Sequence, residues 1–174
     1  MRRPWSAALI TAALLGCSQA WTTVETLERD GVVFTRRPWG IVRTPPALTE
    51  EEARLGWVAY VPGSADGIGS EAFPACSEIG APMLMFACPG EREAATFAVY
   101  AQRAVTVAAA QPGPLVGARR ATIPPTAVDV RAVRIWPQRT DWNSREYYVI
   151  PELLEKRYGV HIPAGRLQQW WVTV

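Results

Sequence analysis

The stretch Thr96-Phe97-Ala98-Val99-Tyr100 decides the fold class, because its β-branched and aromatic residues suit a pleated strand. A second run, Val105-Thr106-Val107-Ala108, follows after the polar pair Gln102-Arg103. Two such runs with a short polar link between them are typical of a β-hairpin. The most regular part of the chain therefore predicts paired strands rather than helices.

Other strand-like runs lie on both sides of this hairpin, and turn-forming Gly and Pro residues separate them. They cover residues 31–36, 57–61, 83–87, 128–136, 144–150 and 167–174. The first follows the turn-forming pair Asp30-Gly31, and the apolar run 83–87 predicts a buried strand. Residues 63–82, rich in Gly, Ser and Pro, predict a long surface loop.

Helical signals are few. Thr49 followed by Glu52 forms a capping box that predicts one short helix ending at Gly56. Residues 151–155 predict at most a helical turn. Seven or eight short strands with one short helix indicate an all-β chain, an antiparallel β-sandwich of immunoglobulin or jelly-roll type. Residues 21–174 are expected to form this single domain.

The first twenty residues have the pattern of an export signal. Arg2 and Arg3 precede an apolar stretch, residues 6–16, which is shorter than the ~20 residues that span a bilayer. Leu14-Leu15-Gly16-Cys17 is similar to a bacterial lipobox, with Cys17 as the lipidated first residue of the mature protein. The alternative is cleavage after Ala20. Either route predicts export to the cell envelope or beyond, with the membrane reached only through the lipid.

Two further cysteines, Cys76 and Cys88, remain after processing. An even pair in an oxidising compartment predicts a disulfide across a short loop, and two free thiols are the alternative. Two Cys with the single His161 do not make a zinc set. No metal or cofactor is therefore expected.

The charge balance excludes an obvious nucleic-acid partner. Without Arg2 and Arg3, the chain has 16 Lys+Arg against 16 Asp+Glu, whereas nucleic-acid binding needs a clustered basic face. Catalytic patterns are also missing. No nucleophile elbow accompanies His161, and Glu152 and Glu155 are interpreted as solvated carboxylates on a turn rather than an acid/base pair. No catalytic residue is assigned.

Aromatic residues gather in one short region. The candidate set comprises four aromatic residues, which stand among polar side chains, together with one arginine: Trp136, Trp142, Tyr147, Tyr148 and Arg139. Aromatic faces beside hydrogen-bonding groups suit sugar rings, because a ring offers C–H faces and hydroxyl edges. Two other interpretations stay open: strand alternation would bury some of these residues in the core, or they form a surface against which another domain docks.

Three longer segments carry a resemblance to a known family. They run from Ala87 to Ala101, from Ala121 to Arg131 and from Arg145 to Leu154. In order and spacing they resemble the N-terminal β-sandwich of large secreted bacterial proteins related to glycoside hydrolase family 123. The resemblance covers roughly residues 31–174, and the final Gln-Gln-Trp-Trp-Val-Thr-Val is similar to a strand that continues into more of the sandwich.

The resemblance implies an accessory role. In that family a barrel-type domain downstream carries the catalytic carboxylate, and no position of this chain matches it. We therefore expect a non-catalytic, exported β-sandwich that continues past Val174, with a downstream catalytic domain or a polysaccharide as its partner. The alternative is a free-standing surface lipoprotein that binds glycan or protein.

Overall fold

The computed structural model describes residues 12–13, 26–37, 45–63, 68–69, 72–107, 110–117, 120–157 and 159–174. Cys17 and nearly all of the predicted export signal, residues 1–20, lie outside the described residues. The elements in chain order are β1 (Ala12–Ala13), β2 (Thr26–Arg29), β3 (Val32–Arg36), α1 (Glu50–Leu55), β4 (Trp57–Tyr60), β5 (Ala94–Ala101), β6 (Val105–Val107), β7 (Leu115–Val116), β8 (Thr122–Ile123), the 3-10 turn η1 (Pro125–Ala127), β9 (Asp129–Arg139), β10 (Glu146–Glu155), β11 (Val160–Ile162) and β12 (Arg166–Thr173).

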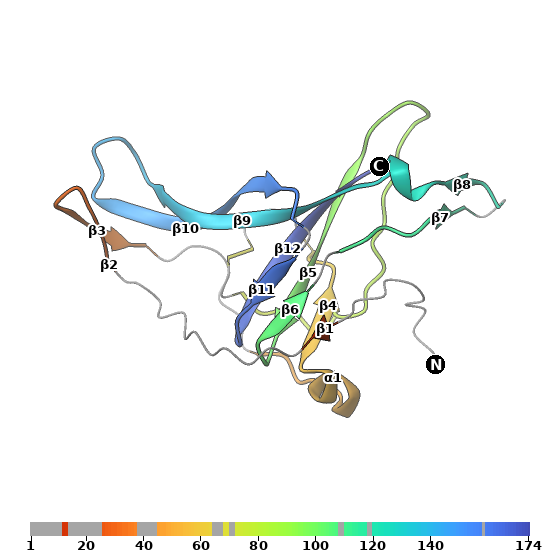
Figure 1. Ribbon diagram of the computed structural model, residues 1–174, viewed down its shortest axis with the longest axis horizontal. Helices are drawn as coiled ribbons and strands as arrows, with labels where there is room; N and C mark the ends of the chain where they lie inside the picture. The colour runs from red at the N-terminus through yellow and green to blue at the C-terminus, as the bar shows by residue number, and fades with distance from the viewer. Residues whose placement is uncertain are drawn as a thin grey trace.

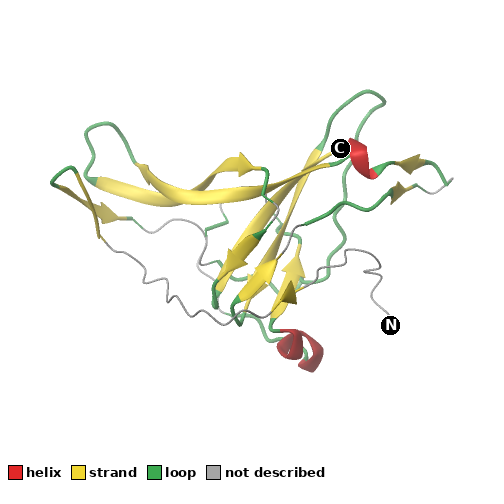
Figure 2. Ribbon diagram, in the orientation of Figure 1, coloured by secondary structure: helices red, strands yellow, loops and turns green. Residues whose placement is uncertain are grey.

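An open seven-stranded sheet dominates the molecule, in the order β2-β3-β10-β9-β12-β5-β4 (Figures 1 and 2). A three-stranded sheet, β1-β6-β11, and the small pair β7-β8 accompany it. The predicted all-β class with one short α-helix is confirmed. The large sheet is mixed rather than purely antiparallel, because β3 runs parallel to β10 over two residues.

The core lies on both faces of the large sheet where β5 and β12 pair. On one face, Val160 and Ile162 of β11 pack with Trp170 of β12. On the other face, Tyr60 and Tyr100 pack beneath the long segment that follows β4. The small sheet thus covers one side, and an irregular segment takes the place of a second full layer on the other.

Helix α1 is the element that sequence reasoning placed best. The Thr49 hydroxyl accepts from the Glu52 N–H, and the Glu52 carboxylate accepts from the Thr49 N–H at 2.8 Å. Gly56 ends the helix in the left-handed region, with φ of 75°. The predicted capping box and its glycine stop are confirmed.

Three local predictions are wrong, because pairing with distant segments, and not local pattern alone, decides which residues form strands and in which sheet. Strands β5 and β6 belong to different sheets, since the link between them bonds elsewhere: Gln102 N–H and Arg103 N–H both donate to the Gly56 carbonyl, at 2.9 and 3.1 Å. Residues 151–155 continue β10 against β9 instead of forming a helical turn. Residues 83–87 form no strand.

The disulfide prediction is also wrong, since Cys76 and Cys88 are both free and exposed. Each cysteine lies beside its own local turn. Ala75 N–H donates to the Glu78 carboxylate at 2.9 Å, and Cys88 N–H donates to the Glu91 carboxylate at 2.9 Å. The irregular run between the two turns carries the chain toward the loop at the top of Figure 1.

We therefore expect both thiols to react without denaturant. Iodoacetamide added to the folded protein, without reductant, should alkylate Cys76 and Cys88, because exposure governs access to a thiol. Peptide mass mapping measures the modification at each position. A disulfide-linked peptide containing both cysteines would contradict the structure.

A long hairpin carries the sheet away from this core. Strand β12 pairs with β9 only over residues 129–132, whereas β9 and β10 stay paired out to Arg139 and Tyr147. Figure 1 shows this two-stranded ribbon reaching toward hairpin β2–β3 at the far left. We call residues 133–154 together with β2–β3 the arm.

Hairpin β2–β3 closes through Asp30 and Gly31, with φ of 53° and 75°. Positive φ at both central residues is the geometry of the type I′ turn that Asp-Gly favours. The turn predicted at this position is confirmed. The hairpin joins the arm through Thr35 N–H and Arg37 N–H, which donate to the carbonyls of Arg145 and Tyr147, both at 2.8 Å.

Candidate functional site

The loop between β9 and β10 presents one tryptophan to solvent. Trp142 is 92% exposed, although local hydrogen bonds hold the loop around it. Asn143 N–H donates to the Asp141 carboxylate at 2.8 Å, and Glu146 N–H donates to the Ser144 hydroxyl at 2.9 Å. Such local side-chain bonds fix turns. The loop therefore holds a large apolar side chain in water on an ordered backbone.

Arg139 connects this loop with hairpin β2–β3. Its guanidinium donates to the Trp142 carbonyl at 3.2 Å and lies over the Phe34 ring, 4.6 Å from the centroid. Stacking of a guanidinium on an aromatic face is favourable. One side chain on β9 thus touches both elements that flank the end of the ribbon.

Tyr147 and Phe34 form a small apolar centre under this connection, at 3% and 4% exposure. Burial raises the pKa of Tyr147, because the ionised phenolate would lose its hydration, and the nearby Arg36 opposes the shift. Tyr147 therefore stays a neutral phenol at neutral pH. The interpretation that these aromatics fill a core applies to Tyr147 and does not apply to Trp142.

Trp136 lies further along β9 and is half-buried. Its indole N–H donates to one oxygen of Glu152, and the Gln138 amide donates to the other at 3.1 Å. Arg134 stacks over the indole, 5.5 Å from the ring centroid, and donates to Glu155 at 2.9 Å. Arg157 donates to the second oxygen of Glu155 at 2.5 Å. The predicted turn is wrong, because Glu152 and Glu155 lie on strand β10, although Glu152 is exposed as expected.

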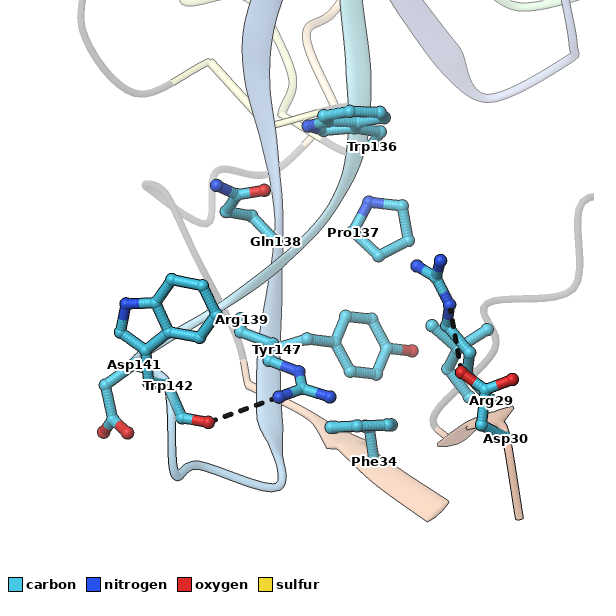
Figure 3. A pocket seen from close by; sticks show the side chains of 11 residues that line it. Arg29, Asp30, Phe34, Trp136, Pro137, Gln138, Arg139, Asp141, Trp142 and Tyr147 are labelled. Atoms are coloured by element: carbon cyan, nitrogen blue, oxygen red, sulfur yellow. Dashed lines mark hydrogen bonds and ion pairs between the residues drawn. The ribbon is translucent and has the colours of Figure 1, made fainter. Parts of the chain in front are cut away.

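These residues surround one open hollow of about 830 Å³ (Figure 3). Its lining comes from β9, from the β9–β10 loop, from the start of β10 and from hairpin β2–β3, and comprises Leu27, Arg29, Asp30, Phe34, Trp136, Pro137, Gln138, Arg139, Asp141, Trp142 and Tyr147. Figure 3 shows the Trp136 ring at one end and the Phe34 ring at the other, with Tyr147 between them.

The structure brings four of the five candidate residues to this hollow: Trp136, Arg139, Trp142 and Tyr147. Tyr148 does not line it, because successive residues of a strand point to opposite faces and Tyr147 takes the inward one. Sequence reasoning missed the wall formed by β2–β3. The Asp30-Gly31 turn predicted the hairpin, but no local signal showed its parallel pairing with β10.

Among the described residues, no group of three or more His, Cys, Asp or Glu side chains could hold a metal ion. His161 lies on β11 and is exposed, away from the hollow. The described residues also include no helix with the length and hydrophobicity to cross a membrane. The hollow thus offers stacking surfaces, hydrogen-bonding groups and balanced charges, which are means of binding.

Comparison with known proteins returned no matching family model, no matching curated protein and no matching solved structure.

Proposed function

We propose that this chain is a non-catalytic, exported accessory module that holds carbohydrate in the hollow of the arm. The proposal rests mainly on one observation. Trp142 is 92% exposed on a loop held by local hydrogen bonds, and it lines the same hollow as Trp136 and Arg139. Because Trp142 stays in water on an ordered backbone, its side chain does not contribute the hydrophobic free energy that burial on folding would give. A ligand that covers Trp142 would recover that contribution.

Carbohydrate suits the hollow by its chemistry. A pyranose ring needs an aromatic surface for its C–H face and donors or acceptors for its hydroxyls. Trp136 and Trp142 supply the surfaces, and Gln138, Arg139 and Asp141 supply polar atoms around them. An open hollow of about 830 Å³ has room for more than one sugar ring.

A second role, docking of a neighbouring domain, is favoured by a different surface. Leu84 and Phe86 are 83% and 90% exposed, and Val116 of β7 is 69% exposed. Figure 1 shows the loop that leads into β5 and the β7–β8 pair at the end of the molecule opposite hairpin β2–β3. Exposed apolar patches mark interaction sites. In this proposal the arm binds glycan, and the opposite end contacts the downstream catalytic domain implied by the glycoside-hydrolase resemblance.

Export is part of the same proposal. The charged start and short apolar stretch of residues 1–20 support secretion, and Cys17 supports a lipid anchor in the cell envelope. An anchored module with a sugar-binding arm would hold polysaccharide near the cell surface. The intact mass of the protein recovered from native envelopes separates a lipidated Cys17 from cleavage after Ala20.

The binding role is tested by replacing Trp142 with alanine. We expect affinity for oligosaccharide to fall about 10- to 30-fold, because an exposed aromatic at the centre of a contact is a typical hot spot. Isothermal titration against a panel of oligosaccharides, chosen first on a glycan array with wild-type protein, measures the change. Folding should be unaffected, since Trp142 is 92% exposed.

Phe86→Ala is the matched control, because Phe86 is 90% exposed and lies outside the hollow. It should leave oligosaccharide affinity within about twofold of wild type. Equal affinity of the Trp142→Ala and wild-type proteins would refute sugar binding at the hollow. A wild-type protein that binds no glycan on the array would leave docking as the function to pursue.

A further inference from the structure

Hairpin β2–β3 forms one wall of the hollow but rests on the neighbouring strands over a short contact. The hairpin residues that line the hollow are Leu27, Arg29, Asp30 and Phe34. The parallel pairing of β3 with β10 covers two residues, whereas β9 and β10 pair along the length of their ribbon. Figure 1 shows the hairpin at the far left end, beside the tip of that ribbon. The wall and the ribbon are therefore joined by few backbone contacts.

Phe34 is the one buried residue of this wall. Every other residue between 26 and 37 is exposed or half-buried. The Phe34 ring lies close to Tyr147, and the Arg139 guanidinium covers it, 4.6 Å from the ring centroid (Figure 3). A buried aromatic ring supplies a large share of the apolar contact at a small junction. Phe34 is therefore the main apolar anchor between the hairpin and the ribbon.

The polar contacts at this junction lie near the surface. Thr35 N–H donates to the Arg145 carbonyl, and Arg37 N–H donates to the Tyr147 carbonyl, both at 2.8 Å. Arg37 also pairs with Glu146 at 2.7 Å, with the two side chains 56% and 39% exposed. Exposed ion pairs contribute little to stability. The hairpin could lose all of these contacts and keep its own pairing and turn, which lie within residues 26–35.

We propose that hairpin β2–β3 is a movable wall of the hollow, which separates from β10 as a unit while the rest of the sheet stays folded. Parts of a protein with few buried apolar contacts open at a lower free energy than its core. Phe34 is the latch that holds the wall closed. When the wall is open, the hollow keeps only its β9–β10 side, so a ligand has access to it from the side of the hairpin.

This inference goes beyond the carbohydrate proposal, and its test contains no ligand, so either can fail without the other. Native-state hydrogen exchange of the full chain is followed by NMR at single amides. The reporters are the Thr35 and Arg37 amides, because their acceptors lie on β10. Phe34→Ala removes the latch. Val33→Ala is the matched control, since Val33 lies on the same strand, is 53% exposed and does not line the hollow.

In the wild type, both reporter amides should exchange more slowly than in an unstructured peptide, but at least about 100-fold faster than the paired amides of β12. Low urea concentrations should leave their rates unchanged, because a local opening exposes little surface. Phe34→Ala should speed their exchange about tenfold or more and leave the β12 amides within about twofold. Val33→Ala should change neither set of amides.

Two results would overturn the proposal. If the reporter amides exchange at the rate and with the urea dependence of the β12 amides, the hairpin opens only when the whole sheet unfolds. If their exchange is equal in Phe34→Ala and in the wild type, Phe34 does not hold the wall closed. The first result needs only the wild-type protein, so it applies even if Phe34→Ala folds poorly.

Discussion

Replacing Trp170 with alanine is expected to lower the free energy of unfolding by about 3–5 kcal/mol, the range for truncating a buried aromatic in a core. Trp170 is 3% exposed, and its ring stacks on Phe97, with 5.3 Å between centroids and 8° between planes. In β12 it pairs with Phe97 on one side and Ala132 on the other. It also packs with Val160 and Ile162 of the small sheet.

The size of this effect comes from position as well as from side-chain volume. Trp170 lies where β5, β12 and β9 meet and where the small sheet covers them, so a cavity there would open between two layers. Surrounding strands are held by backbone ladders and can close such a cavity only in part. Urea denaturation followed by far-UV circular dichroism measures the loss.

Trp171→Ala is the internal control for this measurement. Trp171 has the same volume and the same strand, but it points to the opposite face and is only half-buried. We expect it to cost less than half as much as Trp170→Ala. Similar losses for the two variants would show that the core does not lie between the two sheets.

Elements with local chemistry were predictable from sequence. Thr49 and Glu52 specify the helix start, Gly56 specifies its end, and Asp30-Gly31 specifies a hairpin turn, because each signal acts within a few residues. The strand that contains Phe97 and Val99 was predictable for a related reason. Its β-branched and aromatic residues suit a strand in whichever sheet it joins.

Non-local pairing was not predictable, and it accounts for the errors. The run 102–103 looks like a hairpin turn, but its N–H groups bond to Gly56, which lies far away in sequence. Residues 151–155 contain a proline and two glutamates, yet they are held as a strand by β9 and its bulge. The apolar run 83–87 pairs with no strand among the described residues, so hydrophobicity alone did not make it a strand.

The same distinction between local and non-local signals applies to the candidate site. Trp136, Arg139, Trp142 and Tyr147 belong to one hairpin, so their closeness in sequence predicts closeness in space. Phe34 and its hairpin reach the hollow only through the parallel contact with β10, which covers two residues. Sequence spacing therefore predicts one side of the hollow, and the other side depends on tertiary structure.

Replacing Glu78 with alanine is expected to lower the free energy of unfolding by about 2–4 kcal/mol, because two hydrogen bonds to a buried charge would be lost. Glu78 is 8% exposed. One carboxylate oxygen accepts from Gly63 N–H at 3.0 Å, and the other accepts from Ala75 N–H at 2.9 Å. Its backbone carbonyl accepts from Val61 N–H at 3.1 Å and Ala81 N–H at 3.2 Å. Glu78 thus connects residues 61–63 with residues 75–81, two parts of the segment that follows β4.

This segment covers the second face of the sheet, so its loss should uncover Tyr60 and Tyr100, which pack beneath Ile68 and Phe73. Hydrogen exchange of residues 72–81 should therefore rise in Glu78→Ala, together with the loss of stability seen in urea denaturation. Glu78→Gln is the matched control, because its amide oxygen can keep one of the two bonds, and we expect it to cost about half as much. If Glu78→Ala instead cost less than about 1 kcal/mol, Tyr60 and Tyr100 would be held mainly by apolar contact. The carboxylate at 78 would then only fix the loop's shape.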